Sequence, residues 1–483
     1  MDFSTTTTPT LPLLGLSDDE QALIRTLQAQ YQRSRYAMQI AEAYYLGTQA
    51  IDNLRIAVPE ILEKVLRTIV GWPALAVDPY VERLNLEAFR QSNATDGDEH
   101  LMDLMAANGF EALQAMAYTD ALSLGRAYWM WGTNPEGAGA PPVLTVESPL
   151  NMAVLWDLRG TSPRAAMQEY HSPEDNRRRG ALVVPGKTVQ LAVNDDGTWE
   201  VIGRDEHDFD FVPIVRMAHG VRTNNRDGRS AITPAIMSTT DSACRSLMSL
   251  EVAREIYSVP GMIILGAAED AFQKSDGTPK TAWETYITAV LALEADKNGQ
   301  LPEIHQRQVY DPSTFTKVLD WYASSMSGMV AATPQDLGLY TQGNPASAEA
   351  GVVAESRRDR RSLRIQREFG SDLIRVAQMG IRFENGGDLP SEYERLATDW
   401  EPVTMATPGV TSDAVAKEVK AGAIPATSDV TLKRLGYSAV ERQRLAQDRS
   451  ADDNRGLTRA LVNGLVPTEQ EPQEPTGGDT AGI

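Results

Sequence analysis

Cysteine is almost missing from this sequence, since Cys244 is the only one among 483 residues. A single thiol excludes an intramolecular disulfide and any zinc site built from several cysteines. Cys244 falls at an apolar position of a helical pattern, so we expect a buried structural thiol. The 5 histidines are scattered without an H-E-x-x-H pair, and no G-x-S-x-G sequence occurs. We therefore expect no catalytic residue, no metal site and no cofactor.

Long hydrophobic runs are missing as well. The best candidates, VPGMIILGAA and ITAVLALEA, are far shorter than the roughly 18 apolar residues that a membrane span needs. The amino-terminal stretch MDFSTTTTPTLPLLGLSDDE lacks the basic flank of a secretory signal. We expect no membrane association and a cytoplasmic site of action.

Basic residues are outnumbered by acidic ones. The chain has 45 Lys and Arg against 66 Asp and Glu, which gives a formal net charge of −21. Affinity for nucleic acid comes mainly from basic side chains that neutralise phosphates, so this balance excludes a protein that grips nucleic acid over its whole surface. An acidic channel wall would still let DNA slide past, because the repulsion between its carboxylates and the DNA phosphates prevents tight binding.

One stretch contains part of a phosphate-binding motif. PGKTV, residues 185–189, has the Gly-Lys-Thr of a phosphate loop, but the upstream Gly180 is one residue too far away for G-x-x-x-x-G-K-[ST]. The intervening ALVVP is a β-type run, where the motif needs a flexible cradle. We favour a hairpin turn here, and a nucleotide-binding enzyme stays as an alternative that depends on this stretch alone.

Hydrophobic periodicity predicts an α+β chain that is mainly helical. Ser17 and Glu20 form an S-x-x-E capping box at the start of a first helix, and a second helix is expected over 59–70. Residues 71–89 look extended and apolar. Between about 126 and 217, short runs rich in β-branched and aromatic residues predict an antiparallel meander.

Three long helices are predicted in the second half of the chain. A helix that starts near Thr233-Pro234 and another over 312–333 flank a compact insertion, residues 259–311. The third helix covers about 346–380 and would be roughly 50 Å long at 1.5 Å per residue. Before it lies PQDLGLYTQGNPASAEA, a Gly/Asn/Pro-rich segment that we expect to be a flexible loop.

The third helix carries an arginine-rich run, ESRRDRRSLRIQREFG. Arg357, Arg361 and Arg364 share one helix face because they are spaced by three and four residues. Two interpretations stay open. The run is either a solvated face that pairs with acids on its own helix, or a contact with an acidic surface of a neighbouring subunit.

The order of these elements resembles the portal proteins of tailed double-stranded DNA bacteriophages, of siphovirus type. The strongest likeness is in residues 43–90, which follow a pattern of Y-Y-x-G, then a helix, then W-x-x-x-x-V-D-x-x-x-x-R-L. Leu46 and Ala88 depart from it, where Asp and Gly are frequent. LGRAYWMWG, GRSAITPAI and LGYSAVERQR extend the likeness over about residues 20–450. The residues that fit the pattern are Tyr44, Tyr45, Gly47, Trp72, Val77, Asp78, Arg83 and Leu84.

The resemblance implies a portal architecture of wing, stem, clip and crown, with the antiparallel β-rich region in the wing. The implied segments are a flexible N-terminus at 1–19, a wing at 20–225 with its β-region at 126–217, a stem helix at 226–258, a clip at 259–311, a returning stem helix at 312–333, a tunnel loop at 334–345, a long wing helix with its following segment at 346–410, a crown at 411–455 and a disordered acidic tail at 456–483.

The resemblance also implies a function without catalysis. It implies a homo-oligomer, a ring of about twelve subunits, that forms the channel for DNA packaging, retention and ejection at one capsid vertex. The expected location is the virion, after assembly in the host cytoplasm. The implied partners are double-stranded DNA, the terminase large subunit, neck adaptor proteins, and the major capsid and scaffolding proteins. Another phage head or neck ring protein stays as an alternative.

Two sets of site residues follow from this resemblance. Arg357, Arg361 and Arg364 become candidates for the subunit interface. The tunnel loop would present residues to the DNA channel, namely Gln335, Asp336, Leu339, Tyr340, Thr341, Gln342, Gly343 and Asn344.

Overall fold

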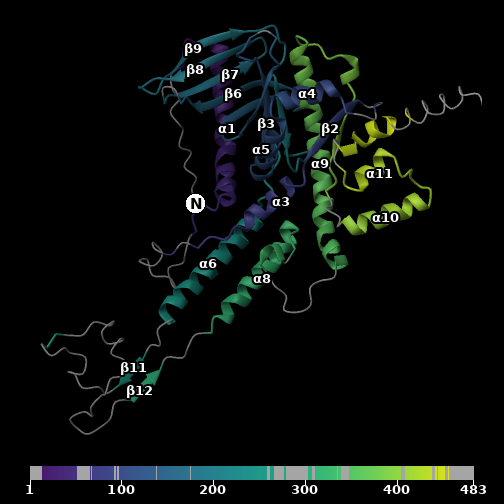
Figure 1. Cartoon of the computed structure of the whole chain (residues 1–483). Helices are drawn as coiled ribbons and strands as arrows, with labels where there is room; N and C mark the ends of the chain where they lie inside the picture. Colours follow the sequence, from purple (N-terminus) through teal and green to yellow (C-terminus); the bar gives the residue numbers. More distant parts are fainter. Residues whose placement is uncertain are drawn as a thin grey trace, which may run out of the picture. The chain divides into compact units, whose positions relative to one another are not determined.

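The structure is a computed structural model that divides into two compact units, Met1–Val403 and Thr404–Ile483, which are described separately (Figure 1). The residues that it describes are 13–51, 66, 68–91, 94, 97–137, 139–173, 176–257, 262–265, 277–278, 303–306, 311–333, 335–338, 348–403, 408–437, 441–442, 444–451 and 455.

Helices and strands alternate irregularly in the first unit, as expected of a mixed α+β chain. Its helices are α1 (Asp18–Tyr45), η1 (Trp72–Ala76), α3 (Asp78–Val81), α4 (Glu99–Ala107), α5 (Phe110–Ser123), α6 (Pro234–Tyr257), α8 (Ser313–Val330), η2 (Gln335–Leu337), α9 (Ala348–Glu384) and η3 (Ser391–Tyr393). Its strands are β1 (Leu13–Leu14), β2 (Leu86–Gln91), β3 (Arg126–Gly132), β4 (Val143–Glu147), β5 (Met152–Trp156), β6 (Pro163–His171), β7 (Arg178–Val184), β8 (Lys187–Val193), β9 (Trp199–Glu206), β10 (Ile214–Ala218), β11 (Met262–Leu265), β12 (Glu303–Gln306) and β13 (Leu396–Trp400).

The start of the chain confirms one prediction from the sequence and corrects another. Ser17 caps α1, and the side chain of Glu20 accepts a hydrogen bond from the Ser17 N–H at 2.9 Å, which completes the predicted capping box. Residues 1–19 were expected to form a flexible N-terminus, but Leu13–Leu14 pair as β1 and α1 begins at Asp18.

Residues 72–81 are helical where we expected an extended segment, because Pro73 and Pro79 favour the first turns of η1 and α3.

The β-region contains two sheets where the sequence predicted a single meander. Strands β5 to β9 form the antiparallel meander, and β1 adds to its edge in parallel with β9. Strand β3 instead pairs with β4 and with the distant β10, which gives a separate three-stranded sheet in the order β10-β3-β4. The pairing of β3 with β10 is long-range, so no local sequence signal reveals it.

Successive side chains of a strand point to opposite faces of its sheet, so each sheet here can pack on both faces and the sheets lie in layers. In β5, Ala153 belongs to the core beneath α1, whereas its neighbour Val154 belongs to the core between the two sheets. In β3, Tyr128 faces the six-stranded sheet and Trp129 faces the helices. The order is therefore α1, six-stranded sheet, three-stranded sheet, and then a helical layer that contains α5 and α9.

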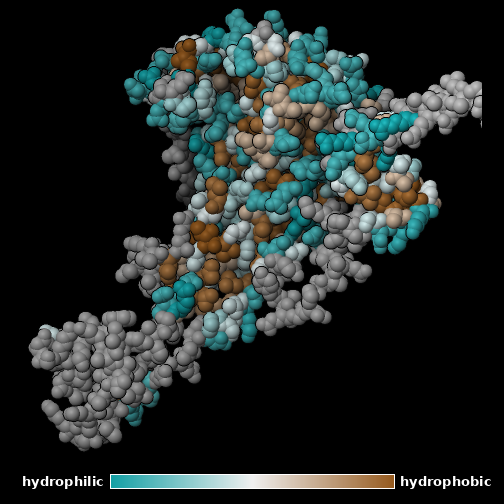
Figure 2. All heavy atoms as spheres, viewed as in Figure 1, coloured by the Kyte–Doolittle hydropathy of each residue, from teal (hydrophilic) through white to brown (hydrophobic). Residues whose placement is uncertain are grey.

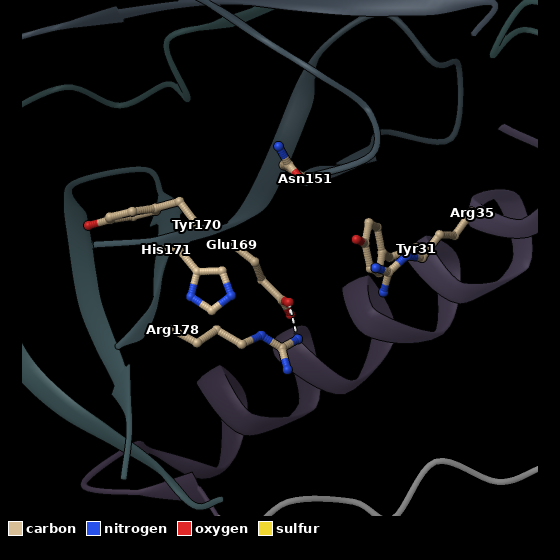
Figure 3. Close-up of a pocket in the computed structure, with 7 residues that line it drawn as sticks. All are labelled: Tyr31, Arg35, Asn151, Glu169, Tyr170, His171 and Arg178. Atoms are coloured by element: carbon tan, nitrogen blue, oxygen red, sulfur yellow. Dashed lines mark hydrogen bonds and ion pairs between the residues drawn. The ribbon is translucent and has the colours of Figure 1, made fainter. Parts of the chain in front are cut away.

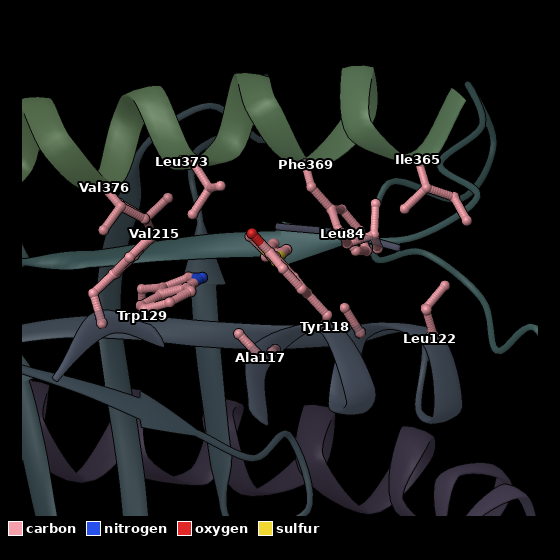
Figure 4. Close-up of a cluster of buried hydrophobic side chains, with 14 of the residues drawn as sticks. Leu84, Ala117, Tyr118, Leu122, Trp129, Val215, Ile365, Phe369, Leu373 and Val376 are labelled. Carbon is pink, nitrogen blue, oxygen red and sulfur yellow. The ribbon is translucent and has the colours of Figure 1, made fainter. Parts of the chain in front are cut away.

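The largest core lies where α5 and α9 meet on the outer face of the three-stranded sheet (Figure 4). The rings of Tyr118 on α5 and Phe369 on α9 stack with their centroids 5.4 Å apart. Phe110 and Trp129 stack at 5.7 Å. The indole of Trp131 donates a hydrogen bond to the Val376 carbonyl of α9 at 2.9 Å. These contacts fix α9 on the sheet.

Two helices extend from this body side by side, α6 and α8 (Figure 1). The first of them starts at Pro234, close to the predicted Thr233-Pro234 start, but the implied stem segment begins at 226 and its first residues form turns. Cys244 on α6 is buried and free, as predicted. In the part of the sequence that connects α6 to α8, β11 and β12 pair antiparallel. Most of the predicted insertion 259–311 and of the predicted helix 59–70 lies outside the described residues.

The second unit contains α10 (Pro408–Lys420) and α11 (Asp429–Arg434). Ser428 caps α11 by accepting the Thr431 N–H at 3.2 Å, as the sequence predicted. The tail at 456–483 lies outside the described residues. Within the described part of the chain, no helix is long and apolar enough to cross a membrane.

Close packing between α9 and β3 gives a test of the core. A Cβ on Gly380 would lie 2.5 Å from the Trp131 ring, so we expect Gly380→Ala to lower the free energy of unfolding by about 1–3 kcal/mol. Gly328 on α8 is the matched control, because a Cβ there meets nothing within 4 Å. Gly328→Ala should stabilise by about 0.5–1 kcal/mol. Equal effects of both changes in thermal denaturation would contradict this packing.

Candidate functional site at the junction of α8 and α9

The end of α8 is held by arginines from α9. Helix C-termini leave four carbonyls without a partner in the helix, and cations are favourable there. Arg361 donates from Nη1 to the Met329 carbonyl at 2.8 Å, and Arg358 donates from Nε to the Ala331 carbonyl at 3.3 Å. Arg358 is buried although it is charged. The arginine run thus fastens one helix onto the end of another.

Two further side chains complete this cap. The Tyr80 hydroxyl of α3 donates to the Val330 carbonyl at 2.8 Å, and the Ser327 hydroxyl donates to the Ala332 carbonyl at 2.8 Å. Ala331 itself has a left-handed backbone with φ 54°, which is unfavourable for a residue with a Cβ. Four successive carbonyls, 329 to 332, are therefore satisfied by side chains while the chain turns sharply out of the helix.

The first residues of the predicted tunnel loop lie against this cap. Gln335 and Asp336 belong to η2, and Asp336 forms an ion pair with Arg358. Burial opposes ionisation of Asp336, but the Thr333 N–H at 2.8 Å and Arg358 together hold its pKa below the ordinary value. The other predicted loop residues lie outside the described part of the chain, namely Leu339, Tyr340, Thr341, Gln342, Gly343 and Asn344.

The three arginines predicted as interface candidates have different surroundings. Arg361 points inward to the cap, whereas Arg364 is exposed and pairs with Glu368 at 2.9 Å on its own helix. Arg357 is exposed and has no ion pair with a described residue. Sequence reasoning missed Arg358, the most buried member of the run. Its i, i+3 spacing to Arg361 was the available signal.

The Tyr-Tyr motif joins three helices next to this junction. Tyr45, at the end of α1, donates to Asp78 of α3 at 2.8 Å, and Tyr44 donates to Asp241 of α6 at 2.7 Å. The motif residues Val77 and Leu84 are buried in the main core. These motif residues therefore join α1 to α3 and α6 and contribute to the main core.

Two other motif segments touch through their glycines. Gly125 and Gly228 have φ values of +99° and +80°. A Cβ on Gly228 would lie 2.2 Å from the Gly125 carbonyl oxygen, so only glycine fits there. This contact brings LGRAYWMWG against GRSAITPAI and sets where α6 begins.

Acidic residues of α9 hold the end of β10 and the loop that follows it. The Ala218 N–H donates to Asp372 at 3.3 Å, and the Gly220 N–H donates to Glu368 at 3.3 Å. Burial raises the pKa of Asp372 to about 6, and Arg375 opposes this rise. The same helix thus contacts α8 through its arginines and the β10 loop through its acids.

A separate recess lies between α1 and the six-stranded sheet (Figure 3). It has a volume of about 470 Å³ and is lined by polar and aromatic side chains. Glu169 pairs with Arg178, and the Arg35 guanidinium lies 5.1 Å from the Tyr31 ring centroid. Because its charges are paired or stacked, we assign no ligand to it.

The GKT stretch is a hairpin turn, as we favoured. Residues 185 and 186 connect β7 to β8, and Lys187 pairs with Glu20 at 2.7 Å. Arg204 binds the same carboxylate at 2.7 Å and, together with Lys187 and the Ser17 N–H, holds the Glu20 pKa far below its ordinary value despite burial. The lysine is thus engaged in joining β8 to α1, so this geometry does not support the nucleotide-binding alternative.

Comparison with known proteins identifies the class that this arrangement represents. The family model described as "Phage portal protein, SPP1 Gp6-like" matches residues 24–434. The chain therefore belongs to this family, and the resemblance inferred from its motifs is confirmed. The portal protein of Mycobacterium phage D29 is 28% identical over 435 residues, which cover 87% of each chain. The portal protein of Mycobacterium phage L5 is 27% identical over 484 residues, 96% of this chain and 97% of that one.

The cap predicts that replacing two adjacent arginines by alanine changes the stability of the fold by very different amounts. Arg358→Ala removes a donor from the Ala331 carbonyl and leaves Asp336 without its cationic partner, so we expect a loss of about 2–3 kcal/mol in unfolding free energy. Arg357→Ala, at the exposed neighbouring position, should change stability by less than about 0.5 kcal/mol. Chemical denaturation of both variants tests this, and similar losses would argue against the cap.

Asp372 predicts a pH-dependent stability. Its pKa rises from an ordinary 3.8 to about 6 on folding, so ionisation above pH 6 opposes folding and this cost disappears below about pH 4. Asp372→Asn should therefore stabilise the fold by up to about 2–3 kcal/mol at pH 7.5 and have little effect at pH 4. The measurement is urea denaturation at both pH values. A constant difference between them would contradict the assigned pKa.

Proposed function

We propose that this chain forms the ring-shaped portal through which double-stranded DNA enters, is retained in and leaves a phage head at one capsid vertex. The match of the portal family model over residues 24–434 carries this proposal. The net charge of −21 supports it, because a ring of such subunits repels DNA from its walls and lets it slide. The working location would be the virion.

Exposed hydrophobic side chains on α8 support assembly with other copies. Trp321 is 66% exposed and Val318 is 39% exposed, three residues apart on one face. Ala323, Met326 and Val330 of the same helix are buried within the chain. Figure 2 shows hydrophobic side chains at the surface over α6 and α8. A second copy that covers this face would bury the tryptophan, as interfaces commonly do.

The described elements fit an assignment to the parts of a portal. We assign α6 and α8 to the stem, and the β11 and β12 pair to the base of the clip, where the terminase large subunit and neck adaptor proteins would dock. The body of the first unit would be the wing and α10 and α11 the crown, facing the capsid and scaffolding proteins. The paired helices that flank an insertion favour a portal over another head or neck ring protein.

The cap at the end of α8 holds the start of the predicted tunnel loop. Arg358 holds both the Ala331 carbonyl and Asp336, so the loop's first residues are tied to α9. We propose that Leu339 to Asn344 act on the DNA in the channel as the tunnel loop. Arg357 is exposed and would meet acidic groups of a neighbouring subunit, whereas Arg361 holds the end of α8 and Arg364 pairs with Glu368 on its own helix.

Assembly gives the direct test of the exposed face. We expect Trp321→Gln to reduce ring formation about tenfold or more, because aromatic anchors carry much of the binding energy of an interface. Leu158→Gln is the control, since Leu158 is fully exposed in a loop between β5 and β6. Mass photometry counts the rings, and thermal denaturation checks the fold. Normal assembly of Trp321→Gln would remove α8 from the interface.

A stiffer tunnel loop tests whether these residues act on the DNA or only connect α8 to α9. Proline at Thr341 and Gln342 fixes the backbone dihedral φ and removes two N–H donors. We expect the double variant to assemble rings normally but to package DNA at about a tenth of the wild-type yield or less. Phage yield and DNA content of the heads are the measurements. If packaging proceeds normally, the loop serves only to connect the helices.

A further inference from the structure

A cavity of about 290 Å³ lies between the start of α6, the last turn of α8 and α9. Three arginines line it, Arg229, Arg361 and Arg364, and its lining contains no carboxylate. Such a grouping is unusual in a chain with 66 acidic and 45 basic residues. Guanidinium groups present planar forks of N–H donors that match oxyanions.

The three positive charges are compensated only in part. Glu368 lies beside the cavity and binds Nε of Arg364 at 2.9 Å, which neutralises one charge. Arg361 donates to the uncharged Met329 carbonyl and keeps its formal charge uncompensated. The Arg229 side chain packs over Gly220, and its guanidinium makes no hydrogen bond or ion pair with any residue that the structure describes, whereas its backbone N–H donates to the His219 carbonyl at 2.8 Å. Arg229, which is exposed, and Arg361 therefore line the cavity without a carboxylate partner among the residues that the structure describes.

Hydroxyl donors lie in the same lining. The Ser230 hydroxyl accepts the Ile232 N–H at 2.9 Å, and the Thr233 hydroxyl accepts the Ile236 N–H at 3.5 Å. Since each oxygen already accepts a hydrogen bond, its own hydrogen stays available for a ligand. His219 also lines the cavity, and burial lowers its pKa, so the imidazole adds no charge at neutral pH.

We propose that this cavity binds an oxyanion of the phosphate class, either free phosphate or a phosphate of a nucleic-acid backbone, through Arg229, Arg361 and Arg364. The two uncompensated charges match a dianion, and the hydroxyls of Ser230 and Thr233 supply neutral donors. Arg361 binds both the ligand and the end of α8, so an occupied cavity stabilises the junction from which the predicted tunnel loop departs. This inference does not depend on ring assembly.

Isothermal titration of the purified full-length protein with inorganic phosphate tests the site. Arg229→Ala should raise the dissociation constant about tenfold, the effect of one lost charged hydrogen bond. Arg226→Ala, which removes an exposed arginine of the same loop that does not line the cavity, should leave it unchanged. Arg364→Ala provides a second variant if Arg229→Ala fails to fold.

Each outcome decides for or against the proposal. No heat with the wild type, or equal binding by wild type and Arg229→Ala, would mean an adventitious ion only and would overturn it. Acetate at the same ionic strength should not bind. Equal binding of acetate would indicate a pocket for a carboxylate, such as an acidic side chain of a second copy, and would also overturn it. A short DNA duplex that displaces phosphate would identify the backbone as the source, and phosphate binding without displacement would identify the free ion.

Discussion

The capture of the α8 carbonyls by side chains is the interaction on which the rest of this structure depends. Arg361, Arg358 and Tyr80 reach the end of one helix from two other helices, α9 and α3. Helix α9 is in turn fixed on the three-stranded sheet by Phe369 and by the Trp131 hydrogen bond to its backbone. A displacement of α9 would therefore be transmitted to α8, to Asp336 and to the residues that follow it. This linkage connects the rigid body with the loop that we assign to the channel.

The layers behind α9 explain why it forms a rigid support. Alternate residues of β3 and β5 belong to different cores, so each sheet is packed on both faces. The glycine contact between Gly125 and Gly228 and the hydrogen bonds of Asp372 and Glu368 then fix the loops beside α9. The same helix uses its basic end for α8 and its acidic residues for the β10 loop, which accounts for the mixed charges along it.

Local signals of the sequence predicted much of this fold. The Ser17 and Glu20 capping box, the antiparallel strands from β5 to β9 and the long α9 were all found as expected, because each depends on neighbours in the chain. The pairing of β3 with β10 and the burial of Arg358 were not predicted, because both depend on where distant segments meet. The arginine run was found from sequence, but its division into buried and exposed members required the position of the α8 end. The portal family was recognised from the order of the elements and the pattern of residues 43–90, and two of these motif residues, Tyr45 and Asp78, are joined by a hydrogen bond.

A structure of the assembled particle, viewed along its axis by electron microscopy, tests the central claim most directly. We expect a closed ring in which Trp321 is covered by the neighbouring copy, the α8 and α9 junction is intact in every subunit, and residues 339–344 project toward the axis. An open or monomeric particle, or a ring in which these residues point away from the channel, would contradict it.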